Sequence, residues 1–119
     1  MKPRATDTEI RAAFAQIVNM TPREIEEWHA TDESKSVGQD CGDGAPVGVR
    51  AGQSTIQILR IKRAPNADDI KHMRRVISFI NRMRTQSPPH NPETSRWRYV
   101  LMNWGHDPLK FSDADSSWR

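Results

Sequence analysis

Apolar side chains recur at intervals of three and four residues along much of the chain, which is the spacing of one face of an α-helix. This pattern predicts five helices, at about residues 8–18, 22–31, 54–62, 67–85 and 95–104. No segment shows the apolar and polar alternation that is typical of a half-buried β-strand. We therefore expect an all-α, compact domain of about five helices.

Capping residues mark the boundaries of these helices. A side-chain oxygen placed just before a helix accepts a hydrogen bond from a free backbone amide, and a glutamate or aspartate three residues later can return one. Proline fits the first helical position, and glycine is typical just past the last. The expected caps are Thr21 (with Pro22 and Glu24), Ser54, Asn66 (with Asp69), Thr94 or Ser95, and Gly105 as the final stop.

Residues 32–53 show no periodic pattern and hold five of the six glycines, between Gly38 and Gly52. We interpret this segment as a long Gly-rich loop between helices two and three. Loops of about 20 residues are uncommon inside compact domains unless they are functional or mobile. A short β-ribbon within residues 36–53 is the main alternative.

Length and composition restrict the class of protein. The 119 residues suffice for one domain, expected at residues 8–110 with a flexible tail at 111–119, and 35% hydrophobic residues allow only a small core. The single cysteine, Cys41, excludes an intramolecular disulfide and a cysteine-cluster zinc site. Without an apolar run of membrane-spanning length or the apolar core of a signal peptide, we expect a soluble protein, cytoplasmic or, in a eukaryote, nuclear.

Charge is distributed unevenly along the chain. The formal net charge of +3 combines six Lys/Arg and nine Asp/Glu in residues 1–50 with twelve and six in residues 51–119. A basic half indicates a polyanionic partner, although such a face can also serve only solubility.

The predicted fourth helix concentrates this positive charge on one side. Its apolar side chains, from Ile70 to Met83, fall on one half of the helical wheel, and its basic side chains fall on the other. Only Arg84 lies in the apolar arc, and no acidic residue follows Asp69 to neutralise the basic arc. Phosphate contacts are one interpretation and a merely solvated helix face is the other. The basic candidates are Lys71, Arg74, Arg75 and Arg82, with Arg60, Lys62, Arg63, Arg96 and Arg98 as flanking contacts.

The segment from Arg96 to Lys110 is rich in aromatic residues. Trp97, Leu101 and Trp104 share one helix face, and a stripe at that spacing is more often core than a platform for stacking bases. Tyr99 and Arg96 lie off this stripe and are the better candidates for ligand contact.

Two other functional classes receive little support. The first two helices resemble a helix–turn–helix, but Glu24, Glu26 and Glu27 would repel phosphates at the reading end, so we reject helix two as a recognition helix. The four histidines have no metal-ligand spacing, and no phosphate loop or nucleophile motif is present. His106-Asp107 could act as a general-base pair, but a turn that ends a helix explains the pair better. We expect no enzyme, no metal and no cofactor.

Three blocks together resemble a known family. They are Asn-Met-Thr-Pro at residues 19–22 with Glu24 and Trp28, residues 31–38 (Thr-Asp-Glu-Ser-Lys-Ser-Val-Gly), and residues 96–110. The chain is similar over about residues 8–110 to a small single-domain family of unknown function from actinobacteria and fungi, loosely labelled DNA-binding. The resemblance implies one compact domain without an assigned active site. A Gly-His-x-x-Gly-Arg-Arg pattern of the family is here Gly-Val-Arg-Ala-Gly-Gln-Ser at 48–54, so its histidine and both arginines are absent.

The sequence therefore predicts a nucleic-acid-binding protein that contacts duplex DNA mainly through phosphates, with little sequence specificity. The alternative is a protein-interaction module in which an acidic face meets a basic face of a partner protein. The third hypothesis is an enzyme built around His106 and Asp107. We expect no membrane association.

Overall fold

The computed structural model describes residues 5–37, 47–86 and 89–109. In these ranges the chain forms helices and contains no β-strand, so the predicted all-α class is confirmed. The helices are α1 (Asp7–Ile17), α2 (Pro22–His29), α3 (Asp32–Ser36), α4 (Val47–Arg60), α5 (Ala67–Arg84), the 3₁₀-helix η1 (Pro92–Thr94) and α6 (Arg96–Asn103).

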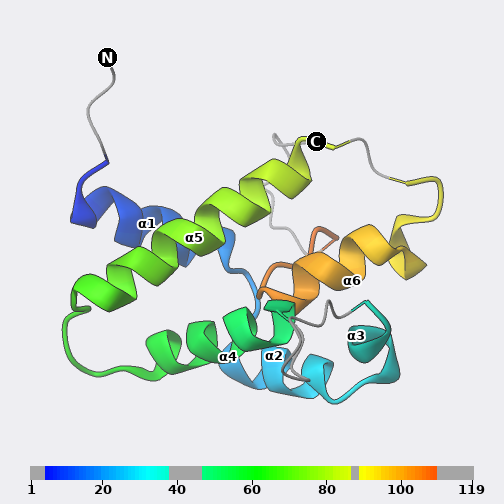
Figure 1. Ribbon diagram of the computed structural model, residues 1–119, viewed down its shortest axis with the longest axis horizontal. Helices are drawn as coiled ribbons and strands as arrows, with labels where there is room; N and C mark the ends of the chain where they lie inside the picture. Colours follow the sequence, from blue (N-terminus) through cyan, green and yellow to red (C-terminus); the bar gives the residue numbers. More distant parts are fainter. Residues whose placement is uncertain (1–4, 38–46, 87–88, 110–119) are drawn as a thin grey trace.

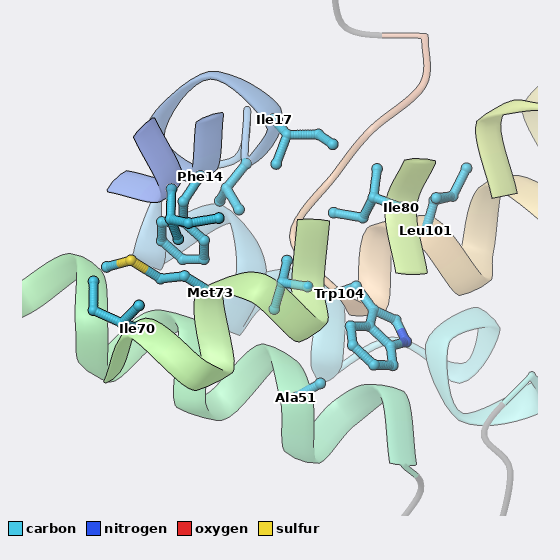
Figure 2. Close-up of a cluster of buried hydrophobic side chains, with 11 residues drawn as sticks. Phe14, Ile17, Ala51, Ile70, Met73, Ile80, Leu101 and Trp104 are labelled. Carbon is cyan, nitrogen blue, oxygen red and sulfur yellow. The ribbon is translucent and has the colours of Figure 1, made fainter. Parts of the chain in front are cut away.

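The longest helix, α5, lies beside α1 across one side of the molecule, and α4 and α2 pack together on the opposite side (Figure 1). Helix α6 lies between these pairs and contacts α2, α3, α4 and α5. The apolar face of α5 supplies four of the eleven buried residues of the main core, as its periodicity predicts. Figure 2 shows Ile70 and Met73 of α5 near Phe14 of α1, Ile80 of α5 near Leu101 of α6, and Trp104 near Ala51 of α4.

Most of the predicted boundaries are confirmed. Thr21 and Glu24 form a reciprocal capping box at α2, with Pro22 in the first turn, and Asn66 and Asp69 form another at α5. Ser95 caps α6. Gly105 follows α6 with a φ of 102°, a conformation that favours glycine, and thereby ends the helix.

The prediction that residues 32–53 lack regular structure was wrong at both ends. Thr31 caps the short helix α3, whose Ser34 is completely buried. Helix α4 begins at Val47, so Ser54 lies inside this helix and does not cap it. Residues 38–46, which include Cys41, lie outside the described ranges, as does the tail from residue 110. Helix α3 raises the number of α-helices in the described ranges from the expected five to six.

Candidate functional site

The first two sequence blocks meet the last one at a buried asparagine. The side chain of Asn103, on α6, is 1% exposed. Its Oδ1 accepts hydrogen bonds from Trp28 Nε1, at 2.7 Å, and from the hydroxyl of Ser34, while its Nδ2 donates to the Ser34 carbonyl at 3.3 Å. These contacts tie α2 and α3 to α6, and we call Trp28, His29, Ser34 and Asn103 the Asn103 junction.

Helix α4 closes the junction through a glycine. His29 Nε2 lies 3.0 Å from the Asn103 carbonyl oxygen, and this nitrogen must donate because a carbonyl only accepts. Burial lowers the pKa of His29, partly offset by this hydrogen bond. A Cβ on Gly52 would lie 2.2 Å from the same oxygen and 2.5 Å from His29 Cε1. Only glycine therefore lets α4 approach this closely.

The side chains of His106 and Asp107 make hydrogen bonds to different partners. His106 is 4% exposed, and its Nδ1 donates to the Ile17 carbonyl at 2.7 Å. The Asp107 carboxylate instead receives two hydrogen bonds from Arg98, each 3.1 Å long, and one from the backbone amide of Leu109. Both side chains connect the turn after α6 to neighbouring segments.

A second set of hydrogen bonds connects this turn to the segment between α1 and α2. Asn19 exchanges hydrogen bonds with the backbone of Asp107, donating through Nδ2 to its carbonyl at 3.0 Å and accepting from its amide at 2.8 Å. Met20 donates its amide to the Gly105 carbonyl at 3.3 Å. The Asn-Met-Thr-Pro segment and the Gly-His-Asp-Pro segment therefore bind each other, and several of their polar groups have a structural role.

The predicted basic face of α5 is largely present at the surface. Lys71, Arg75 and Arg82 are exposed and fall within about 40° of one another around the helix axis. At a rise of about 1.5 Å per residue they extend over roughly 16 Å. We call these three residues the basic stripe. Arg74 belongs to the side of α5 that faces α1, where its Nη2 donates to the Ala5 carbonyl at 2.7 Å.

Aromatic rings support two side chains of the stripe. The guanidinium carbon of Arg75 lies 5.5 Å from the ring centroid of Trp104, and that of Arg82 lies 6.0 Å from the centroid of Phe79. Phe79 and Trp104 are themselves stacked, with centroids 4.0 Å apart. Arg96, at the first position of α6, is exposed and lies near Phe79. Within the described ranges, no carboxylate forms an ion pair with the stripe or with Arg96.

The other predicted basic contacts behave differently. Arg60 makes two hydrogen bonds to Glu26, which lower the pKa of that carboxyl, and Arg63 pairs with Asp69 at 2.9 Å. Arg98 is 24% exposed, and its hydrogen bonds to Asp107 raise its pKa. Lys62 is exposed near the start of the connection between α4 and α5.

The stripe of large apolar side chains on α6 faces the core. Leu101 and Trp104 are buried in the core and Trp97 packs against it, with its Nε1 donating to the Met83 carbonyl at 3.0 Å. Their interpretation as core residues is confirmed. Tyr99 is half-buried and its ring lies 5.3 Å from that of Trp28, between centroids. Tyr99 therefore borders the Asn103 junction, on a different part of α6 from Arg96.

The residues of the Asn103 junction to which sequence reasoning gave no role are His29, Ser34 and Asn103, together with Gly52 beside them. The motif at residues 31–34 carried a usable signal, because Thr31 precedes two acidic residues and its side chain caps α3 by accepting from the Ser34 amide. Nothing in the sequence indicates that Asn103 would be the buried partner 69 residues away.

The fold and its contacts define a small all-helical domain with a polar junction and an exposed basic stripe. A model of the family described as "Protein of unknown function (DUF3140)" matches residues 13–102, and the chain belongs to this family. No curated protein and no solved structure matches the chain.

No helix within the described ranges is long and apolar enough to cross a membrane. No group of three or more His, Cys, Asp or Glu side chains in these ranges is placed to hold a metal ion.

Proposed function

We propose that the protein binds nucleic acid, preferentially duplex DNA, by placing backbone phosphates on the basic stripe and on Arg96. The observation that carries this proposal is four exposed cationic side chains, two of them supported by aromatic rings, without an intramolecular carboxylate among the described residues. Phosphate contacts fix a protein on nucleic acid without reading its sequence. This matches the low specificity expected from the sequence and the DNA-binding label that the resemblance carries.

The set of contact residues becomes narrower than the sequence alone predicts. Arg60, Arg63 and Arg98 already pair with carboxylates, and Arg74 donates to the backbone before α1. The carboxylates neutralise the charge of the first three side chains, and the guanidinium of Arg74 is turned toward the start of α1, so we assign these four no primary role. Lys62 is retained as a flanking contact.

A protein-interaction module is the weaker proposal, since it needs an acidic face for the basic stripe of another copy or of a partner. The most acidic helix in the chain is α2, and two of its carboxylates are already paired. Glu26 pairs with Arg60 at 2.6 Å and Glu27 with Arg23 at 3.0 Å. This pairing leaves little acidic surface on α2.

Charge reversal of the stripe tests the proposal. We expect Lys71→Glu, Arg75→Glu and Arg82→Glu together to weaken binding of a random duplex by a hundredfold or more, because attraction of phosphates becomes repulsion. Fluorescence anisotropy of a labelled duplex at about 50 mM salt measures the affinity. All three side chains are exposed, so circular dichroism should show an unchanged helical fold.

A matched control variant distinguishes the effect of the stripe's position from the effect of net charge on binding. Arg11→Glu, Arg23→Glu and Lys35→Glu together change the net charge by the same amount, at exposed positions of α1, α2 and α3. We expect this variant to lose much less affinity than the stripe variant. Equal losses in the two variants would refute the assignment to α5.

A further inference from the structure

A cleft opens beside the basic stripe. Its volume is about 240 Å³, and it lies between the C-terminal half of α5, helix α6, the end of α3 and the first turn of α4. The side chains and backbone that line it are mainly apolar. Among the described residues they include Phe79, Met83, Arg96, Val100, Asn103 and Trp104.

Two aromatic rings border the cleft. Phe79 and Trp104 stack with an interplanar angle of 11°, and Met83 and Val100 add apolar surface. Trp104 is 4% exposed, so Phe79 carries most of the accessible aromatic surface. The polar groups of Asn103 are engaged by Trp28, Ser34 and His29, which leaves the cleft apolar in character.

Three arginine side chains lie in or beside the cleft. Arg96 lines the cleft, and the guanidinium groups of Arg75 and Arg82 lie near its two aromatic rings. Gly48 belongs to the first turn of α4, so the positive end of that helix dipole is directed to the same region. An occupant should therefore combine a flat apolar body with flanking negative charge.

We propose that the cleft binds one unpaired nucleobase while Arg75, Arg82 and Arg96 hold the adjacent phosphates. This proposal rests on the proposed function and makes it more specific, because it names duplexes with unpaired bases as preferred ligands. A base has the required planar face, and stacking of bases on aromatic side chains tolerates any sequence. The volume equals roughly eight waters at liquid density, which is enough room for one base.

Three DNA probes distinguish the base from its phosphate. One is an intact duplex, the second carries one extra unpaired nucleotide, and the third carries an abasic nucleotide at the same place. The second and third probes have the same number of phosphates and differ only in the base. We expect the unpaired base to be bound about tenfold tighter than its abasic counterpart, within the range that base–aromatic stacking supplies.

Two variants locate this preference. Val100→Trp should fill the cleft and remove the tenfold difference while the affinity for intact duplex stays unchanged, because Val100 lies outside the basic stripe. Phe79→Leu keeps an apolar side chain but removes the aromatic face, and should reduce the difference in the same way. If Val100→Trp fails to fold, as judged by circular dichroism, Phe79→Leu decides the question.

Each outcome separates this proposal from the proposed function. Binding of intact duplex with equal affinity for the base and abasic probes would overturn the cleft proposal and leave the phosphate-binding proposal intact. Absence of binding to every probe would overturn both. A preference for the base that persists in the folded variants would place the base elsewhere and also overturn the assignment to this cleft.

Discussion

Replacing Asn103 with leucine is expected to lower the free energy of unfolding by about 4 kcal/mol, because two or more buried polar groups then lose their partner at roughly 1–3 kcal/mol each. Trp28 Nε1 and the Ser34 hydroxyl both donate to Asn103 Oδ1, and Ser34 is completely buried. Leucine supplies similar volume but no acceptor. The midpoint and slope of urea unfolding, followed by circular dichroism, give the change.

Two control variants test whether the loss of stability in Asn103→Leu comes from the Asn103 junction. Asn81→Ala removes an exposed amide from α5 and should change stability by less than about 0.5 kcal/mol. Ser34→Ala combined with Asn103→Leu should cost less than the sum of the single changes, because the two side chains share one interaction. A loss below about 1 kcal/mol for Asn103→Leu would contradict the role of the Asn103 junction.

Replacing Gly52 with alanine is expected to cost about 3 kcal/mol, although the same change inside an exposed helix stabilises by about 1 kcal/mol. The added methyl group would lie 2.2 Å from the Asn103 carbonyl oxygen, a backbone atom that cannot rotate away. It would also lie 2.5 Å from His29 Cε1 and so disturb the hydrogen bond between His29 and Asn103. Urea unfolding again measures the loss.

Helix α4 contains a second glycine that serves as a control. A Cβ on Gly48 would lie 3.2 Å from both Asn103 Cβ and Trp104 Nε1, a tight contact that requires a shift of only a few tenths of an ångström. We expect Gly48→Ala to change stability by less than about 1 kcal/mol. If Gly52→Ala proves no worse than Gly48→Ala, α4 is not packed against the Asn103 junction as closely as described.

Much of the fold was predictable from local signals. The apolar periodicity of α5 and the capping boxes at Thr21 and Asn66 depend on residues within one helical turn, and each was confirmed. The short helix α3 and the first turns of α4 were missed because they lack such strong local signals. Their helical state depends on tertiary burial, of Ser34 in one case and of Ala51 in the other, rather than on strong intrinsic propensity.

The candidate site was predictable only in part. The stripe on α5 follows from helical geometry within one segment, whereas the partners of Arg60 and Arg98 depend on how helices are arranged. Glu26 lies 34 residues from Arg60, and Asp107 lies beyond the end of α6. Periodicity reveals which side of a helix is polar, but it does not show which charges find partners across the fold. The neutralised arginines could therefore not be separated from the exposed ones.

The salt dependence of duplex binding tests the central claim most directly. If Lys71, Arg75, Arg82 and Arg96 each displace a counterion, log K should fall with log salt at a slope of about −3 to −4. Between about 50 and 200 mM salt this slope corresponds to an affinity loss on the order of a hundredfold, measured by anisotropy of a labelled random duplex. Absence of binding at the lower salt, or affinity that does not change with salt, would contradict phosphate recognition by the basic stripe.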